Sequence, residues 1–124
     1  LKQLADALDE RVFGDLVARL RRILRALITE NMGEQILLLE EVSREIAIHR
    51  RTLNRRLSEQ DTSFKALLDE ARYDIARQLL RDTQLPALKI AGMLGYADST
   101  AFIRAFRRWS GITPAVWRST HKRI

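Results

Sequence analysis

The sequence predicts an all-α fold: two helix-turn-helix subdomains joined by a long linker helix, about seven helices in all. Three observations predict it. Apolar residues recur at intervals of three and four, and no stretch shows the alternation of a strand. Only 2 prolines and 5 glycines interrupt 124 residues, which leaves room for long helices. A short helix, a tight turn and a second helix occur twice in the same pattern.

The segment 1–14 comes first, with Leu1, Leu4 and Leu8 on one face. We expect it to be a linker or the tail of a missing N-terminal sensor domain. The chain begins with Leu rather than Met, so we expect a fragment of a longer protein.

The first helix-turn-helix subdomain is predicted over 15–62. Its opening helix, 15–29, has an apolar face. A linker containing Gly33 follows at 31–34, and then come helices at 38–46 and 49–59. The residues expected to point inward from these helices are Leu16, Leu20, Ile23, Leu24, Leu27, Leu39, Val42, Ile46, Leu53 and Leu57.

A connecting helix over 63–81 and a second subdomain over 82–124 complete the chain. Thr62 or Ser63 is expected to cap the connecting helix. Helices then follow at 86–94, with Pro86 at an early helical position, at 99–109, and from Pro114. The connecting helix is expected to bury Phe64, Leu67, Leu68, Ala71, Ile75 and Leu79.

The two units align residue by residue. "VSREIAI" (42–48) matches "IAGMLGY" (90–96) at an offset of 48. After the turn the offset is 49, which places Phe102 over Leu53 and Phe106 over Leu57. The chain therefore repeats one helix-turn-helix plan twice.

Charge divides the chain into an acidic and a basic part. Residues 1–48 carry seven Lys/Arg and nine Asp/Glu, whereas 49–124 carry fifteen and seven. A strongly basic half indicates a polyanionic partner, either nucleic acid or an anionic membrane surface, and the less specific interpretation is a solvated cationic face.

The helix over 49–59 contains four arginines in "HRRTLNRRL". With Leu53 and Leu57 inward, Arg55 points almost directly away from the core at about 100° per residue. Arg51 and Asn54 share or flank that face. An outward helix face of this kind suits the major groove, where arginine binds guanine and asparagine binds adenine. At the borders, His49, Arg50 and Arg56 are expected to contact phosphates.

In the second unit, Arg104 occupies the place of Arg55, Thr100 that of Arg51 and Ile103 that of Asn54. Arg107 and Arg108 extend the charge and are expected to contact phosphates. The connecting helix would span roughly 28 Å, close to the roughly 34 Å of one duplex turn. The two helices would then enter successive major grooves about 10 bp apart.

These motifs resemble the DNA-binding domain of AraC/XylS-type bacterial transcription regulators over about residues 38–118. "IAGMLGY" followed by "AFIRAFRRWSGITP" is the most specific part, and "TSFKALL" and "RYDIARQLL" support it. The resemblance implies two helix-turn-helix subdomains joined by a long helix and a separate sensing or dimerising domain. It implies that one groove is read by Arg51, Asn54 and Arg55, and the next by Ser99, Thr100 and Arg104.

The sequence departs from the family pattern at four places. Ala47 stands where the first turn usually has glycine, and His49-Arg50 replaces Ser-Pro. If the first turn needs a positive φ at residue 47, alanine there lowers the stability by about 1 kcal/mol. Ile103 is apolar where a polar residue is common. We expect it either to contact a thymine methyl group or to make the second recognition helix less selective between bases. Trp117 replaces Tyr or Phe and is expected to pack.

Other functions find little support. No cysteine, phosphate loop, nucleophile elbow or triad is present, so we expect neither an enzyme nor a cofactor nor a metal. The acids of the connecting helix are expected to form ion pairs with Arg72 and Arg77, and the aromatic residues to pack in the core. Two outcomes are expected for the basic residues near the C-terminus: they contact phosphates, or they lie in a frayed end of the last helix. These residues are Arg118, Lys122 and Arg123. The remaining alternative is a helical protein-interaction or dimerisation module with a nonspecific basic face.

The expected partners are double-stranded DNA, RNA polymerase and the sensor domain of the same chain, with no membrane. No apolar run approaches the roughly 18 residues that a membrane span needs. A bacterial protein located in the cytoplasm with the nucleoid is expected.

Overall fold

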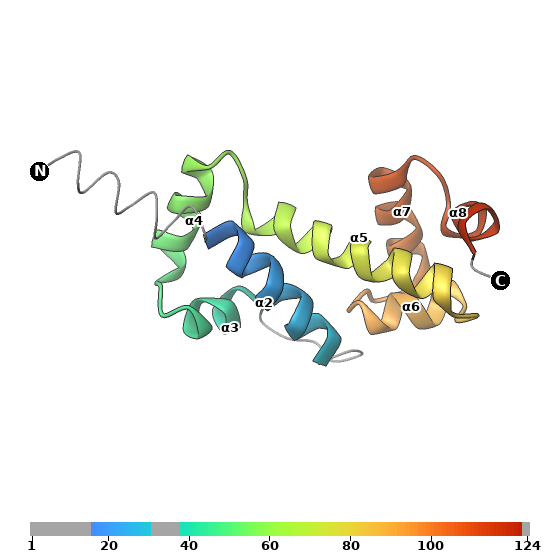
Figure 1. Cartoon of the computed structure of the whole chain (residues 1–124), viewed down its shortest axis with the longest axis horizontal. Coiled ribbons are helices and arrows are strands. Elements are labelled where there is room, and N and C mark those ends of the chain that lie inside the picture. Colours follow the sequence, from blue (N-terminus) through green and yellow to red (C-terminus); the bar gives the residue numbers. More distant parts are fainter. Residues whose placement is uncertain (1–15, 31–37, 123–124) are drawn as a thin grey trace, which may run out of the picture. The chain divides into compact units, whose positions relative to one another are not determined.

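The computed structural model describes residues 16–30 and 38–122, and Figure 1 shows its helices. Within these residues there are seven helices and no strand, which confirms the predicted fold class. None of the described helices is long and apolar enough to cross a membrane. The helices are α2 (Leu16–Glu30), α3 (Leu38–Glu45), α4 (Arg50–Glu59), α5 (Phe64–Asp82), α6 (Ala87–Met93), α7 (Ser99–Ser110) and α8 (Pro114–His121).

Several predictions fall outside the described residues. These are the segment 1–14 with its three leucines, the linker at 31–34 and Arg123. The side chain of Leu39 is also outside them, although its backbone belongs to α3.

The helix boundaries agree with the predicted ones to within about one residue, and the caps explain why. The Ser63 hydroxyl accepts a hydrogen bond from the Ala66 amide at 3.0 Å, so Ser63 is the side chain that caps α5. Pro86 is the N-cap of α6 rather than a residue inside it, because its backbone is extended (φ −71°, ψ 160°). Its carbonyl accepts the first helical bond, from the Ile90 amide at 3.1 Å.

The chain divides into two compact units, and α5 contributes to both. Among the described residues, the first unit holds 16–27 and 38–71, and the second holds 28–30 and 72–122. In the first unit, α2, α3, α4 and the start of α5 bury one apolar side chain per turn, the pattern of amphipathic helices sharing a core. These buried residues are Leu16, Leu20, Leu24, Val42, Ile46, Leu53, Leu57, Leu67 and Ala71, whereas Ile23 and Leu27 are half-buried.

In the second unit, α6 and α7 lie side by side (Figure 1). The core is aromatic: the rings of Phe102 and Phe106 are 5.9 Å apart, and Trp117 meets Phe106 edge-on at 6.1 Å. Core packing was predicted for these three and is confirmed, whereas Phe64 and Trp109 are half-buried. Along this part of α5 the buried residues are Ile75, Ala76 and Leu80.

The predicted buried stripe of α5 was wrong at its C-terminal end. Leu79 was expected inside, but Leu80 is buried (1% exposed) and Leu79 is half-buried, as is Leu68 further toward the start of the helix. A straight helix advances by 3.6 residues per turn, so a stripe followed in steps of four drifts around the axis. Burial at both Ile75 and Ala76 marks the place where the stripe shifts by one residue.

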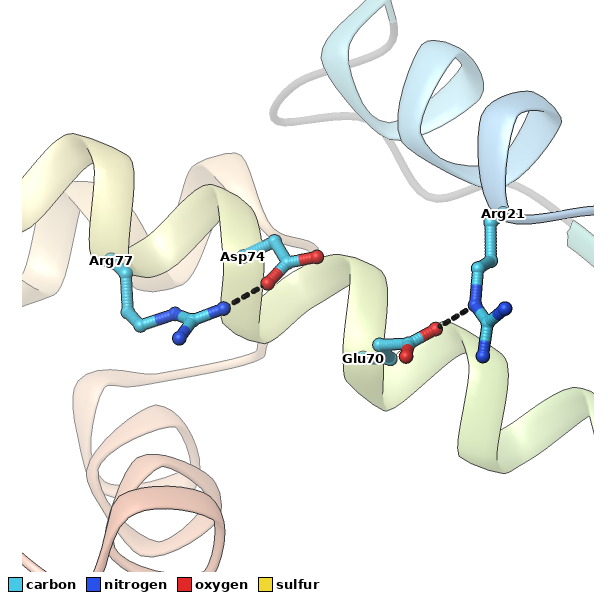
Figure 2. Close-up of polar contacts among 4 residues, drawn as sticks. All are labelled: Arg21, Glu70, Asp74 and Arg77. Carbon is cyan, nitrogen blue, oxygen red and sulfur yellow. Dashed lines mark hydrogen bonds and ion pairs between the residues drawn. The ribbon is translucent and has the colours of Figure 1, made fainter. Parts of the chain in front are cut away.

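Acidic residues of α5 form ion pairs, as predicted, but with partners that differ in part (Figure 2). Glu70 accepts from Arg21 of α2 at 2.7 Å, and Asp74 pairs with Arg77 one turn along α5. Arg72 instead lies over the Tyr96 ring, with its guanidinium carbon 5.0 Å from the ring centroid. The Arg21–Glu70 pair is about half exposed, so it contributes well under about 1 kcal/mol to stability.

Each helix-turn-helix turn has the same backbone geometry. After α3, the Ile48 amide donates to the Ser43 carbonyl at 3.0 Å, and Ala47 has φ 57°. After α6, the Tyr96 amide donates to the Ala91 carbonyl at 2.9 Å, and Gly95 has φ 88°. Both are Schellman-type helix ends, which require a left-handed residue just past the helix. Alanine therefore stands at a position that favours glycine, as the sequence suggested.

We predict that Ala47→Gly stabilises the first unit by about 0.5–1 kcal/mol. The left-handed conformation costs an L-residue roughly 1–2 kcal/mol, and part of the gain is lost to the greater freedom of glycine in the unfolded chain. Urea unfolding followed by circular dichroism measures the change. Ala66→Gly, at an exposed position in the first turn of α5, should instead destabilise by about 0.5–1 kcal/mol. A loss of stability in Ala47→Gly would contradict the account of this turn.

Candidate nucleic-acid interface

Helix α4 is fixed at its start by a histidine and along its length by two leucines. The Nδ1 atom of His49 accepts a hydrogen bond from the Arg51 amide at 3.2 Å, which makes His49 the N-cap. The bond requires the neutral tautomer whose Nδ1 is unprotonated. Leu53 and Leu57 are fully buried. His49 thus fixes the start of α4, and the buried pair sets the rotation of α4 about its axis.

The opposite face of α4 carries the predicted base-reading residues. Arg51, Asn54 and Arg55 are all exposed. Arg55 lies about 200° from Leu53 and about 160° from Leu57 around the helix, so it projects away from the core. Within residues 16–30 and 38–122, neither Arg51 nor Arg55 has an ion-pair or hydrogen-bond partner for its side chain. Both guanidiniums are therefore available to an external anion or base edge.

The two border arginines of α4 differ. Arg50 is exposed, whereas the Arg56 side chain is only 22% exposed and donates to Glu59 at 3.3 Å. The repeat explains the difference, because the offset of 49 aligns Arg56 with Ala105, which is buried in the second unit. Arg56 thus stands on the inward side of its helix. Its phosphate role remains a prediction, and its pairing with Glu59 works against it.

Helix α7 is built by the same means with different residues. The Asp98 carboxylate accepts from the Ala101 amide at 2.8 Å and caps the helix start. Phe102 and Phe106 are fully buried. Gly111, with φ 85°, ends the helix by donating its amide to the Arg107 carbonyl at 2.8 Å. The orientation of α7 within its unit is therefore fixed by its N-cap, by its buried apolar pair and by the left-handed residue at its end.

The outward face of α7 carries Thr100 and Arg104, both exposed, with Ser99 and Ile103 half-exposed beside them. Arg107 and Arg108 are exposed further along the helix. Among the described residues, none of the three arginines has an ion-pair or hydrogen-bond partner for its side chain. The predicted positions are therefore brought together on one face of one helix.

The charge of the two helices is distributed differently. Arg107 and Arg108 align with Ser58 and Glu59 of α4. The first turn of α4 therefore carries Arg50 and Arg51, where that of α7 has no basic residue, and α7 has two arginines in its last turn. In helix-turn-helix proteins the N-terminal residues of the recognition helix meet base edges. The charge pattern thus favours base contacts from α4 and backbone contacts from the end of α7.

Arg118 was predicted to touch phosphates or to fray, and the structure shows it half-buried and bonded to backbone carbonyls of its own unit. Its Nε donates to the Leu80 carbonyl at 2.9 Å, and one Nη donates to the Leu85 carbonyl at 2.6 Å. Sequence reasoning missed this role because backbone carbonyls leave no signal in the residue pattern. Lys122 is exposed.

Comparisons with known proteins agree with this architecture. A family model described as a helix-turn-helix domain matches residues 42–120. The ornithine utilization regulator of Pseudomonas aeruginosa is 44% identical over 80 residues, 64% of this chain and 24% of that protein. The transcriptional regulator CdpR of P. aeruginosa matches with TM-score 0.76 and 35% identity, over 89% of this chain and 33% of CdpR.

The chain belongs to the AraC/XylS-type helix-turn-helix family. A further solved relative is the DNA-binding domain of AdpA in complex with a target DNA. It matches with TM-score 0.63 and 26% identity, over 81% of this chain and 90% of that one. This AraC-type chain is a DNA-binding domain of the kind that transcriptional regulators carry, as the motifs indicated. It spans only a quarter to a third of the regulators named above.

Proposed function

We propose that this AraC-type domain binds double-stranded DNA sequence-specifically by inserting α4 and α7 into major grooves. One observation carries the proposal. In each helix a fully buried apolar pair turns an exposed arginine, Arg55 or Arg104, to the opposite side. An exposed arginine whose side chain has no ion-pair partner among the described residues has the chemistry that guanine O6 and N7 require.

The base-reading roles follow from exposure and chemistry. Arg51, Arg55 and Arg104 would donate two hydrogen bonds each to guanine, and Asn54 would pair with adenine N6 and N7. Ser99 and Thr100 would bond to bases near the start of α7. The residues proposed to contact phosphates are His49, Arg50, Arg56, Arg107 and Arg108, of which Arg56 is expected to contribute least because it is paired with Glu59.

We further propose that the two helices read one bipartite site. Helix α5 has 19 residues and thus a length of roughly 28 Å, and it contributes to both units. Subdomains over 15–62 and 82–124, connected through 63–81, would then engage half-sites about 10 bp apart. The segment 1–14 would lead to a sensor domain.

The whole regulator would act on transcription through RNA polymerase, in the bacterial cytoplasm at the nucleoid. The domain itself has no proposed catalytic role. The relatives that carry this domain are named as regulators, and the matched part is only a fraction of each.

We predict that Arg55→Ala and Arg104→Ala each erase base preference at one position of the selected site. Loss of one bidentate contact should reduce discrimination there by about 5- to 150-fold, equivalent to about 1–3 kcal/mol. Arg19→Ala removes the same charge from an exposed position on α2 and serves as the control. Fluorescence anisotropy with a panel of single-base variants of the site measures the preference at fixed salt.

In that experiment, salt-dependent nonspecific binding should survive in both variants, because phosphate contacts supply it. The Arg19→Ala control should keep its full preference at every position. If both Arg55→Ala and Arg104→Ala kept theirs as well, the base-reading assignment would be wrong. A wild-type chain with no base preference would favour the alternative of a nonspecific basic face.

We also predict that Ile103 reads a thymine methyl. Its half-exposed apolar side chain lies on α7 between Thr100 and Arg107, one turn from each, where a groove offers only one apolar partner, the thymine C5-methyl. Replacing one thymine of the α7 half-site by deoxyuridine should weaken wild-type binding about fourfold, the value of one buried methyl group. Ile103→Ala should be insensitive to the same replacement. Equal sensitivity in both proteins would remove this role.

A further inference from the structure

Arg118 joins three helices of the second unit through two carbonyl oxygens. It extends from α8, and its Nε and one Nη reach Leu80 and Leu85 at 2.9 and 2.6 Å. Leu80 lies in the last turn of α5, and Leu85 lies in the connection just before Pro86, the N-cap of α6. The guanidinium therefore ties α8 both to the end of α5 and to the beginning of α6.

The Leu80 carbonyl needs a donor from outside its own helix, and the Leu85 carbonyl belongs to the connection between helices. Carbonyls in the last turn of a helix have no amide one turn further on to bond with, and the carbonyl end of a helix attracts positive charge. Thr83 fixes the same connection from within the chain. Its hydroxyl donates to the Leu79 carbonyl at 2.6 Å and accepts from the Leu85 amide at 3.2 Å. Arg118 supplies the second, long-range attachment.

Helix α8 packs against α7, so the position of α8 determines the position of α7. The Thr113 hydroxyl caps α8 by accepting from the Val116 amide at 3.2 Å. Trp117 is 7% exposed and meets Phe106 of α7 edge-on at 6.1 Å. Arg118 is the next residue, which means that the helix packed on α7 through Trp117 is the one that clamps the α5–α6 connection.

We propose that Arg118 is a positioning residue that sets the direction in which α6 and α7 leave α5. The proposal rests on the proposed function, because it concerns how α7 is presented to its half-site. Two of the five guanidinium N–H groups are committed to Leu80 and Leu85, and through this attachment the residue acts on α7. The clamp fixes the start of α6, and the left-handed turn at Gly95 then fixes α7 relative to α6.

Arginine suits this clamp better than lysine. Nε and Nη2 lie in one rigid plane and donate to two separate acceptors at once. A lysine ammonium carries the same charge on a flexible stem and is strongly hydrated. Lysine at 118 would therefore keep the charge at the end of α5 and lose the fixed geometry.

The consequence for DNA binding is discrimination between spacings. Moving one half-site by a base pair shifts it by about 3.4 Å and rotates it by about 34° around the duplex. A rigid α5–α7 connection cannot follow that movement, and a loosened one can follow part of it. Arg118→Met should thus tolerate altered spacing while still recognising each half-site.

The experiment measures binding to the selected bipartite site with spacers of the selected length and one base pair shorter and longer. For the wild type we expect each altered spacer to weaken binding at least about tenfold, because at least one bidentate contact is lost. In Arg118→Met the penalty should fall to about threefold or less, and in Arg118→Lys it should be intermediate. Arg19→Met, which removes an equal charge from α2, should retain the wild-type penalty.

Helicity and thermal unfolding of each variant are recorded at the binding temperature. If Arg118→Met does not fold, Arg118→Lys decides, since it keeps the charge and most of the length. A folded Arg118 variant with an undiminished spacing penalty overturns the positioning role and leaves the proposed function intact. A wild-type chain that selects no bipartite site overturns the proposed function, and the positioning role with it.

Discussion

The burial of two apolar side chains four residues apart is the constraint on which both recognition helices depend. Leu53 and Leu57 in α4, and Phe102 and Phe106 in α7, are completely withdrawn from solvent. A helix that buries positions i and i+4 has no remaining freedom to rotate about its axis, so position i+2 must face outward. In each unit that position is an arginine. Rotating either helix to hide its arginine would expose both apolar side chains, at a cost of about 3–6 kcal/mol for the pair.

The same plan carries different chemistry in the two units. In the first, alanine occupies the left-handed turn position and a histidine caps the recognition helix; in the second, glycine and aspartate take these places. Arg56 fills a position that is buried alanine in α7, and its charge is met by Glu59. The first turn of α4 has two arginines where that of α7 has none, and α7 has two arginines in its last turn. The two helices are therefore suited to unequal shares of base reading and backbone attachment.

Most of the fold was predictable because helical periodicity, caps and breakers are local properties of the sequence. The seven helices of the described residues and the outward face of Arg55 follow from spacing, and the left-handed turn at Ala47 was suggested by the family resemblance. What was missed depends on tertiary packing. The buried stripe of α5 shifts from Leu79 to Leu80 where two neighbouring residues are both buried, and periodicity alone does not place that shift. Arg118 donates to backbone carbonyls 38 and 33 residues away, and every residue type offers such an acceptor. Arg56 was expected at the border of the outward face of α4. It stands on the inward side instead, at the position that a buried alanine, Ala105, occupies in α7.

Methylation interference on the selected DNA site tests the central claim most directly. Dimethyl sulfate methylates guanine N7 in the major groove and adenine N3 in the minor groove, so one experiment reports which groove is occupied. The account predicts that methylated guanines block binding in two clusters about 10 bp apart on one side of the duplex, and that methylated adenines do not. Interference confined to adenine N3, or no interference from guanine N7, would contradict the claim that the outward faces of α4 and α7 lie in major grooves.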